Sequence, residues 1–371
     1  MPIVLNGTTG ITTPTYNGST TAEYLVPVTG FKNRIINGDM TIDQRNAGAS
    51  VTPSNSYTLD RWICYTSQAS KFTVQRNAGS VTPPAGFSNY LGVTSTSAYS
   101  VGSTDFFSIE QPIEGFNAAD LAWGTASAQS VTLSFWVRSS LTGTFGGAFY
   151  AGTGTLGYAF SYTISAANTW EQKSVTIAGP TTGTWASNNA AFGSICFGLG
   201  IGSSYSWATG SWLSQVVRSA TGATSVVGTN GATFYITGVQ LEKGSNATSF
   251  DYLPYGTELA LCQRYYEQLG YGSLAIAEAG STYVMCLQYR TQKRSAASIG
   301  LTVTSNIRLR QFGTADRDAN TASAGNVAGS TTGASFKVSG FNSIGSTSTP
   351  ACVCFTTTSE DGNLFFASAE L

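Results

Sequence analysis

No histidine occurs among the 371 residues of this chain. Histidine is the commonest general base and the commonest nitrogen ligand for metals, so its absence excludes the serine and cysteine triads that depend on it. Charged residues make up only 10% of the chain, and 18 Lys plus Arg against 19 Asp plus Glu leave a formal net charge of −1. Such a chain has no global field to attract nucleic acid or an anionic membrane. We therefore expect recognition to be local and mostly uncharged.

Long apolar runs are missing as well. No stretch approaches the roughly 20 consecutive apolar residues that a membrane-spanning helix needs. The start of the chain, MPIVLNGTTG, lacks the basic region and the long apolar region of a signal peptide. We therefore expect a soluble protein that is neither inserted into a membrane nor exported by a cleaved signal.

Cysteine is sparse, and the six cysteines are spread over the chain at Cys64, Cys196, Cys262, Cys286, Cys352 and Cys354. Disulfide scaffolds are short and dense in cysteine, so this spread predicts buried free thiols in a protein assembled in a reducing cytoplasm. Cys352 and Cys354 alternate as on one face of a strand, but no histidine or second cysteine pair completes a zinc set. We expect neither a metal nor a cofactor.

Glycine, aromatic residues and short apolar segments are abundant. There are 42 glycines, and aromatic residues reach 12%. From about residue 31 to 255, strand-length apolar stretches alternate with Gly, Asn, Ser and Pro turns, which is typical of all-β domains. Clear examples are residues 131–137, 159–164, 173–177, 195–199 and 233–241. The pattern predicts an all-β fold, a jelly-roll β-sandwich of two packed sheets over residues 31–255.

Three further segments complete the predicted organisation. Residues 1–30 are rich in Thr, Gly and Asn and hold too little apolar content to fold alone, so we expect an extended N-terminal attachment arm. Residues 256–270 are predicted to be a helical linker, with a threonine at its start and Gly270 at its end. Residues 271–371 return to strand-like segments and predict a second, smaller β-sandwich domain, with residues 315–334 as an exposed loop.

The predicted helix carries one apolar stripe, formed by Leu259, Cys262, Tyr265, Tyr266 and Leu269. An isolated helix of about 12 to 15 residues is marginal in water, so this helix needs a packing partner. The stripe can pack on the preceding sandwich or on copies of itself. We favour the second arrangement, a homotrimer around this helix.

The densest acidic group of the sandwich segment is formed by Asp105, Glu110 and Glu114. Glycoside hydrolysis needs two carboxylates about 5 to 10 Å apart. Glu110 and Glu114 would share one face of a regular strand, but Pro112 between them indicates an edge or a loop. We expect these acids to be solvated, and the protein not to be an enzyme.

Aromatic residues in turns are the best candidates for binding. Neutral sugars stack on exposed aromatic faces while amides and hydroxyls complete hydrogen bonds, and such sites need no net charge. The stretches TWASNN and YSWATGSW fit this description. The candidate glycan-binding residues are Trp185, Asn188, Tyr205, Trp207 and Trp212, with simple packing as the alternative for Trp212.

Cations gather in the last hundred residues, at Arg290, Lys293, Arg294, Arg308, Arg310 and Arg317. A solvated hairpin face is one interpretation. The other is a patch for an anionic surface polymer such as phosphorylated lipopolysaccharide, whose affinity would fall as salt rises.

The stretch NRIINGDM holds Asn37-Gly38, the strongest short turn signal, and predicts a turn before the first sandwich strand. This stretch, together with DQRNAGAS, YTLDRW, SFWVRSS and FYITGVQLEKGSNATSFDYLPYGTELALCQRYYE, resembles segments that recur in tail-fibre and related virion proteins of tailed bacteriophages. The resemblance covers about residues 31–270, and beyond them it rests chiefly on the closing Ala-Glu-Leu at 369–371.

The resemblance implies a jelly-roll domain of the carbohydrate-binding-module type, framed by NGDM and YITGVQL. Related modules often hold a structural calcium partly through an acidic residue of the last strand, where this sequence has Thr237 and Gly238, so a calcium bound through Asp39 is not expected. It also implies a virion protein assembled in the host cytoplasm. Its partners would be other virion proteins, through the N-terminal arm, and host cell-surface polysaccharide, with neither nucleic acid nor a membrane.

We therefore expect a virion structural protein, a tail fibre or tail-associated adhesin that contributes to host-surface glycan recognition. Two alternatives stay open. One is a non-adhesive capsid or tail decoration protein, and the other is a glycan depolymerase.

Overall fold

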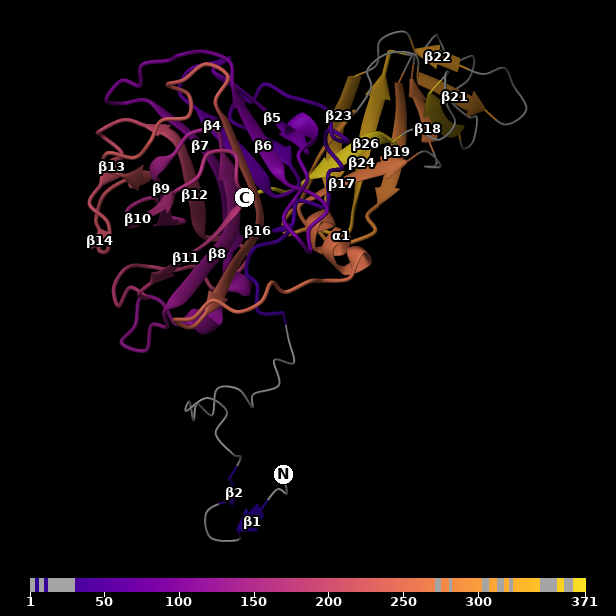
Figure 1. Ribbon diagram of the computed structural model, residues 1–371. Coiled ribbons are helices and arrows are strands. Elements are labelled where there is room, and N and C mark those ends of the chain that lie inside the picture. Colours follow the sequence, from indigo (N-terminus) through magenta and orange to yellow (C-terminus); the bar gives the residue numbers. More distant parts are fainter. Residues whose placement is uncertain are drawn as a thin grey trace. The chain divides into compact units, whose positions relative to one another are not determined.

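The computed structural model describes Val4–Asn6, Gly10–Thr12 and residues 31–270, 275–279, 282–301, 307–311, 317–319, 323–340, 352–356 and 363–371 (Figure 1). The chain divides into two compact units, Met1–Lys32 and Asn33–Leu371. In the first unit, strands β1 (Val4–Asn6) and β2 (Gly10–Thr12) pair antiparallel. Docking of this N-terminal arm on another protein stays a prediction. The second unit is described below.

Two antiparallel sheets form the sandwich of the second unit. The larger sheet has the strand order β14-β10-β9-β12-β7-β4-β3, and the smaller has the order β11-β8-β16-β6-β5. The strands of the larger sheet are β3 (Ser56–Leu59), β4 (Trp62–Thr66), β7 (Phe106–Glu114), β9 (Gly143–Ala151), β10 (Gly157–Ile164), β12 (Ala191–Ile201) and β14 (Trp212–Leu213). Those of the smaller sheet are β5 (Phe72–Arg76), β6 (Leu91–Ser95), β8 (Val131–Ser139), β11 (Glu171–Ile177) and β16 (Thr233–Lys243).

Shorter elements connect these strands. The two-residue strands β13 (Ser206–Trp207) and β15 (Ser219–Ala220) pair with each other. Three short 3-10 helices are η2 (Ala78–Ser80), η3 (Gly115–Asn117) and η4 (Ala119–Leu121). The predicted all-β sandwich is confirmed, and each of the five stretches that the sequence pattern singled out is a strand or lies within one.

The core lies between the two sheets and follows from the alternation of the strands. In β8, Val131, Leu133, Phe135 and Val137 are all fully buried in it. In β7 of the opposite sheet, Phe107, Ile109 and Ile113 lie in the same core. Because successive side chains of a strand point to opposite faces, this alternation leaves the other positions of each sheet on an outer face.

The turn predicted at Asn37-Gly38 is a buried junction. Asn37 has a left-handed backbone (φ 57°), and its amide donates to the carbonyls of Ile42 (2.8 Å) and Asp60 (2.9 Å) and accepts from the Ile42 N–H (2.8 Å). The indole of Trp62 donates to the Asn37 carbonyl (3.0 Å). A Cβ at Gly38 would lie 2.1 Å from the carbonyl oxygen of Val239, so only glycine allows this turn to lie against β16.

The helix α1 (Tyr255–Gln263) is shorter than predicted. The residues after it turn at Arg264 and continue as strand β17 (Tyr266–Gly270), so the prediction of a helix to residue 269 is wrong. Strand β17 pairs with β26 (Asn363–Ser368), and this long-range pairing outweighs local helix propensity. Among the described residues, no helix is both long and apolar enough to span a bilayer.

The apolar stripe predicted as a trimer seam is occupied by the chain itself. Cys262 and Tyr265 are fully buried in a cluster with Ile36 and Ile42, and Leu259 packs against the same cluster. Of the remaining stripe residues, Tyr266 stacks on a phenylalanine of β26, and Leu269 lies in the core of the C-terminal lobe. The prediction of a trimer seam along this helix is therefore wrong, because the side chains that would form it are buried within one chain. A homotrimer through another surface stays a prediction.

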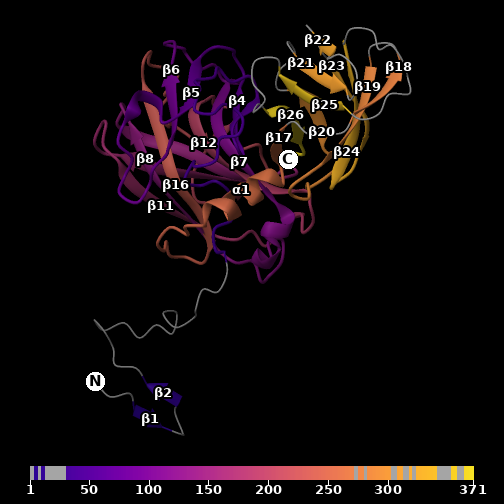
Figure 2. The same ribbon diagram turned by 90° about the vertical axis from the view of Figure 1, so that its right-hand side faces the viewer.

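The C-terminal lobe consists of two sheets that pack face to face (Figure 2). Its three-stranded sheet has the order β17-β26-β20, and its seven-stranded sheet has the order β22-β21-β25-β18-β19-β24-β23. The strands not yet given are β18 (Ala275–Ala279), β19 (Thr282–Gln288), β20 (Ser298–Leu301), β21 (Ile307–Gln311), β22 (Arg317–Ala319), β23 (Ser323–Gly329), β24 (Gly333–Ser339) and β25 (Cys352–Thr356). The prediction of a loop over residues 315–334 is wrong, because β22, β23 and the start of β24 lie there. These strands form backbone hydrogen bonds with neighbouring strands, which the composition of the segment does not reveal.

The closing Ala-Glu-Leu of the chain returns to the sandwich. Glu370 forms ion pairs with Arg45 (2.6 Å) and with the fully buried Arg61. The guanidinium of Arg45 lies 3.7 Å from the ring centre of Tyr266, and that of Arg61 lies 3.6 Å from the ring centre of Tyr265. Three of the segments that carry the sequence resemblance, which contain Arg45, Arg61 and Tyr265, thus meet at one place with the end of the chain.

We expect Asn37→Ala to lower the free energy of unfolding by roughly 3 kcal/mol, because buried backbone groups lose their partners and alanine is strained at positive φ. Urea denaturation would measure the change. Asn168 is the matched control, since it has a similar backbone (φ 58°) but an exposed side chain. Asn168→Ala should cost about 1 kcal/mol, and equal losses in the two variants would contradict the role given to the Asn37 amide.

A second prediction concerns Glu258, whose carboxylate accepts a hydrogen bond from the Asn37 N–H. Burial raises the pKa of this carboxyl from 4.5 to about 7. The folded protein therefore binds this proton more tightly than the unfolded chain, and the free energy of unfolding falls as pH rises from about 4.5 to 7. Glu258→Gln should remove this loss. Between pH 5 and 8, the free energy of unfolding of the variant should therefore rise by about 1 to 2 kcal/mol relative to that of the wild type. A stability difference that does not change with pH would contradict it.

Candidate functional site

Small residues form the floor of the outer face of the larger sheet. Ala148 and Ala159 are fully buried neighbours on β9 and β10. A Cβ at Gly146 would lie 2.3 Å from the Ser219 hydroxyl, and one at Gly157 would lie 2.6 Å from the Cβ of Val217. These positions are small because the segment around Val217 and Ser219 lies flat on the sheet. The sheet is therefore covered here by its own chain, which delivers a cation to its outer face.

That cation is Arg218, and its partner is Glu110 of β7. The two side chains form an ion pair in which Glu110 is fully buried and the arginine is 18% exposed. Glu110 also accepts hydrogen bonds from the hydroxyls of Ser108 (2.6 Å) and Tyr150. With three partners the carboxylate is well satisfied, which is the condition under which a buried charge is tolerated.

Aromatic rings surround the guanidinium of Arg218. Its carbon lies 4.8 Å from the ring centre of Phe106, 5.3 Å from that of Tyr65 and 5.6 Å from that of Tyr150. Tyr205 packs edge-on against Phe106 at 5.8 Å. All four rings are half-buried, so each keeps part of its surface in water. Burial also raises the pKa of Tyr65 and Tyr150, which keeps both phenols protonated, and the proton of the Tyr150 hydroxyl is donated to Glu110.

Trp207 completes this group from the covering segment. Strand β13 carries it beside β15 in a parallel pair, and the side chain packs, as that of Tyr150 also does, against a small cluster that includes Val217. The indole N–H donates to the carbonyl of Val216 (3.3 Å). We call Tyr65, Phe106, Tyr150, Tyr205 and Trp207, with Arg218 among them, the Arg218 platform. Half-exposed rings around a neutralised ion pair can stack on a sugar and donate hydrogen bonds to it.

The predicted glycan-binding residues are divided between two places. Tyr205 and Trp207 belong to the Arg218 platform, but Trp185 and Trp212 pack against each other with ring centres 5.6 Å apart at the edge of the sandwich core. Their indole N–H groups donate to backbone carbonyls. Asn188 is exposed in the loop that follows Trp185. The five residues therefore do not form one site, and the role of each in binding stays a prediction.

The prediction that the acidic residues of the sandwich are solvated is wrong, because all three are buried. Asp105 is buried and accepts hydrogen bonds from the hydroxyls of Ser67 and Tyr99, both at 2.8 Å. Glu114 is also buried and is bound by Arg264 and by the Tyr265 hydroxyl, both at 2.5 Å. For Glu114 the prediction failed because Arg264 and Tyr265 lie 150 and 151 residues away in the sequence.

The two glutamates of β7 do not form a catalytic pair. Four residues of strand place the Cα atoms of Glu110 and Glu114 about 13 Å apart. Each carboxylate is already held by an arginine and a tyrosine hydroxyl. Pro112 lies between them in an interior strand, which is tolerated because the pairing of β7 with β4 ends at Glu110.

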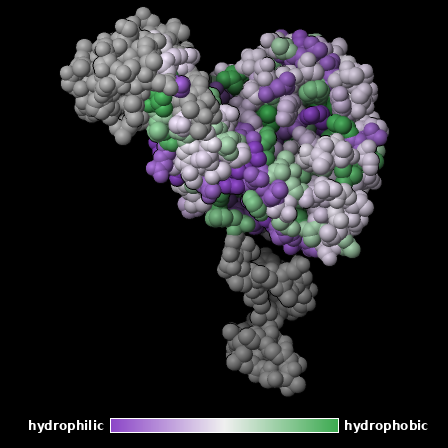
Figure 3. Space-filling model, turned by 180° about the vertical axis from the view of Figure 1, so that it is seen from behind, coloured by the Kyte–Doolittle hydropathy of each residue, from purple (hydrophilic) through white to green (hydrophobic). Residues whose placement is uncertain are grey.

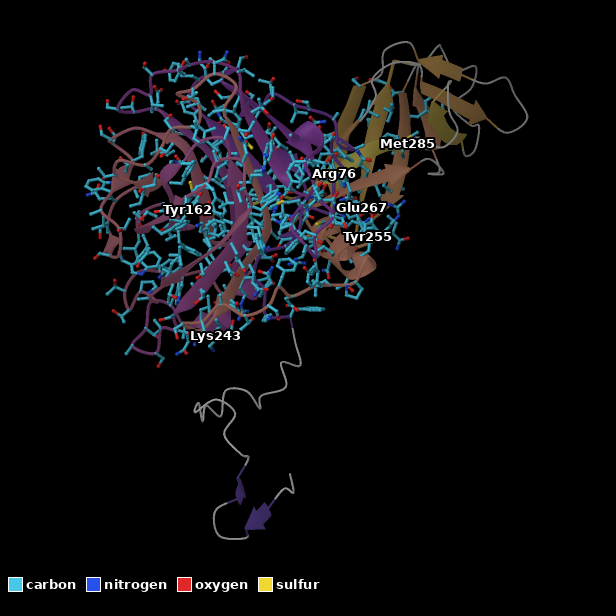
Figure 4. All side chains as sticks on the ribbon, in the orientation of Figure 1. Arg76, Tyr162, Lys243, Tyr255, Glu267 and Met285 are labelled. Carbon is cyan, nitrogen blue, oxygen red and sulfur yellow. The ribbon has the colours of Figure 1, made fainter. Side chains whose placement is uncertain are left out.

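The predicted cationic patch is wrong for two of its members. Lys293 is fully buried against the fully buried Glu267, and Figure 4 labels this glutamate. Arg294 donates to the backbone carbonyls of Asn189, Ala369 and Glu370. Arg290 is 60% exposed. For Arg308, Arg310 and Arg317 the structure describes strand backbone only, and their side chains lie outside the described residues. Local sequence did not reveal Glu267, which neutralises Lys293, or the backbone carbonyls that bind Arg294.

Metal-binding groups of three or more His, Cys, Asp or Glu are absent from the part of the chain that the structure describes. The carboxylate of Asp39 bonds to the Thr41 hydroxyl (2.7 Å). Cys64, Cys196 and Cys262 are buried free thiols as predicted, whereas Cys286 is free but exposed. The side chains of Cys352 and Cys354 lie outside the described residues.

Sequence reasoning missed Tyr65, Phe106, Tyr150 and Arg218 as members of the platform. The first three lie in strands, where aromatic residues usually belong to the core. Their position opposite the core-facing residues of each strand was a usable signal, since Phe106 alternates with the core residue Phe107. Nothing local connects Arg218 with Glu110, which lies 108 residues earlier.

Replacing Arg218 by methionine should lower the free energy of unfolding by about 2 to 4 kcal/mol, because it leaves the buried Glu110 without its counter-charge. The double variant Glu110→Gln/Arg218→Met should recover at least half of this loss. Urea denaturation of both variants measures the coupling. Additive losses would contradict the ion pair as the support of the platform.

Comparisons with known proteins give only remote similarities. No protein-family model and no curated protein matches the chain. Among solved structures, the enzymatically active domain of tailspike protein 4 from bacteriophage CBA120 is 13% identical with a TM-score of 0.33, covering 57% of this chain and 21% of that chain. A putative sugar binding protein from Bacteroides thetaiotaomicron is 14% identical (TM-score 0.34; 57% of this chain, 100% of that one). TmCBM61 in complex with β-1,4-galactotriose is 11% identical (TM-score 0.30; 57% and 99%). The structural neighbours thus include a phage tailspike domain and carbohydrate-binding proteins, at similarities too low to transfer a ligand or an activity.

Proposed function

We propose that the protein is a tail fibre or tail-associated adhesin of a tailed bacteriophage that binds host-surface glycan on the Arg218 platform. The observation that carries the proposal is the platform itself, in which three half-exposed aromatic rings surround an arginine whose charge Glu110 neutralises, and Tyr205 packs against one of these rings. Such a surface suits an uncharged ligand with both apolar and hydroxyl-bearing faces, which describes a sugar ring.

The surface composition of the sandwich supports the same proposal. Figure 3 shows the sandwich from the side opposite to that of Figure 1. Most of this surface has intermediate hydropathy, and the apolar residues form small separate groups. Protein interfaces with a large hydrophobic centre need a broader apolar patch than these groups supply. This side of the molecule therefore suits a hydrated ligand better than an apolar protein partner.

The virion role rests on the sequence segments that resemble tail-fibre proteins. In this proposal the N-terminal arm, residues 1–30, attaches the protein to other virion proteins. A homotrimer would present several copies of the platform to the host surface and raise avidity. The seam of that trimer must lie away from the helix α1, whose apolar face is already covered.

The proposal describes a binding protein and not an enzyme, because neither glutamate of β7 is available as a general acid or base. Two other functions are alternatives. A decoration or cement protein would use the same fold without a ligand. A depolymerase would need a pair of carboxylates that lies outside the platform.

The double variant Tyr205→Ala/Trp207→Ala should weaken glycan binding at least about tenfold, since it removes two stacking surfaces. A glycan array, followed by titration calorimetry with the best ligand, measures the loss. The control is Phe116→Ala, an aromatic residue that is 62% exposed on η3, and it should bind as the wild type does.

Three outcomes would count against the proposal. Equal binding by the double variant and the wild type would place the ligand elsewhere. A wild-type chain that binds no glycan on the array would favour a decoration protein. Release of oligosaccharides from host surface polysaccharide would favour a depolymerase.

A further inference from the structure

The outer face of the smaller sheet is polar where β11, β8 and β16 lie side by side. Ser174, Ser134 and Gln240 are neighbours across the three strands, and Gln172 and Thr237 flank Trp136 in the next row. A bulge between Thr237 and Gln240 in β16 places both side chains on this side of the sheet, where both are fully buried. This face is opposite to the one that carries the Arg218 platform, because the sandwich core lies between the two sheets.

A loop closes one side of this face and forms a pocket. The pocket has a volume of about 420 Å³ and is lined by Gln172, Lys173, Ser174, Ala247, Thr248 and Ser249. This volume lies within the range of about 300 to 1,000 Å³ that is usual for small-ligand sites. The loop is fixed from below by Glu242, which is buried and accepts hydrogen bonds from the Thr248 N–H (2.8 Å) and hydroxyl (2.7 Å). The wall of the pocket is therefore held in place before a ligand arrives.

The polar groups of the pocket are uncharged or neutralised. Lys173 forms an ion pair with Glu171 at 2.6 Å. The side chains of Gln172 and Ser174 are exposed and make no hydrogen bond within the described part of the chain. An amide and a hydroxyl that face water from a concave surface can both donate and accept, which is the pattern that sugar hydroxyls need.

Aromatic rings continue the surface beyond the pocket. Trp136 is half-buried and lies directly across from Gln172. A Cβ at Gly238 would lie 2.6 Å from the ring of Phe87 and 3.1 Å from that of Trp136, so glycine lets these two rings approach each other over β16. Phe87 contacts Phe250 with ring centres 5.1 Å apart, and Phe250 contacts Tyr252 at 4.9 Å. Tyr252 is 55% exposed and ends the strip.

We infer that this pocket and the adjoining strip from Trp136 to Tyr252 form a second binding site, for a neutral oligosaccharide. One sugar unit occupies the pocket between Gln172 and the loop at Thr248, and the next units run over the aromatic strip. Lys173 is the one charged residue that lines the described pocket, and Glu171 neutralises it. An anionic polymer would find no free positive charge there, so a neutral ligand is preferred.

The second site goes beyond the proposed function because it makes each chain bivalent. The two sites lie on opposite outer faces of the sandwich, so one polysaccharide chain cannot reach both without bending around the edge. One copy of the protein can instead bind two polysaccharide chains, which raises avidity on a dense host surface.

Fluorine NMR on the full chain labelled with 5-fluorotryptophan tests the second site. Trp136→Phe and Trp207→Phe assign one resonance to each site, and the probes are cellohexaose, laminarihexaose, maltohexaose and mannohexaose. At least one probe should shift the Trp136 resonance. In Tyr205→Ala/Trp207→Ala its midpoint concentration should stay unchanged. In Gln172→Ala/Tyr252→Ala the midpoint concentration of the Trp136 shift should rise more than tenfold. The control is Gln129→Ala, which replaces an exposed glutamine outside the pocket.

The two proposals fail separately in this experiment. The absence of any shift at Trp136 with all four probes overturns the second site. A Trp136 shift that disappears in Tyr205→Ala/Trp207→Ala also overturns it, because a single site then accounts for both signals. A Trp207 resonance that no glycan perturbs counts against the Arg218 platform and leaves the inference about Trp136 intact.

Discussion

The buried amide of Asn37 is the constraint on which the rest of the structure depends. Asn37 has a left-handed backbone in the turn that lies against β16, and its side-chain amide both donates a hydrogen bond to Ile42 and accepts one from it. The backbone carbonyl of Asn37 accepts a hydrogen bond from the indole N–H of Trp62. The same residue reaches helix α1 through Glu258. Because a buried amide is costly unless every polar atom is bonded, these contacts form together or not at all. The first turn, the sandwich and helix α1 are held together at this place.

The Arg218 platform uses the same physical device on another part of the sandwich. A fully buried carboxylate, Glu110, is tolerated because an arginine and two hydroxyls satisfy it. Its function there is to hold the covering segment, and with it Tyr205 and Trp207, on a floor of glycine and alanine. Rings held in this way lose little conformational entropy when a ligand stacks on them, which favours binding without a strong charge.

The sequence predicted what short-range pattern determines. In residues 131–137 every second side chain is apolar and buried, and these residues lie in strand β8 as predicted. The helix was placed correctly at its start but extended too far, because pairing of β17 with a strand almost a hundred residues later overrides local propensity. The same limit applies to the charged residues. Lys293 was predicted to bind an anionic polymer, but the fold of the C-terminal lobe places it against Glu267, which neutralises it.

The candidate site was predictable only in part, for the same reason. Tyr205 and Trp207 were singled out because sugars stack on exposed aromatic rings, which makes aromatic residues in turns better candidates than those in strands. Their position beside Arg218 depends on the small residues of β9 and β10, and no local signal connects those strands with the covering segment. Trp185 and Trp212 carry the same local signal and yet pack at the edge of the core. Composition therefore identifies candidate rings, and only the fold determines which of them share a surface.

Hydrogen–deuterium exchange of the full chain, with and without surface polysaccharide from a susceptible host, tests the central claim most directly. The account predicts slower exchange in the covering segment, residues 205–220, when the polysaccharide is present, since a ligand on the Arg218 platform restricts its opening. Unchanged exchange in this segment, with protection elsewhere or nowhere, would contradict the claim that the platform binds glycan.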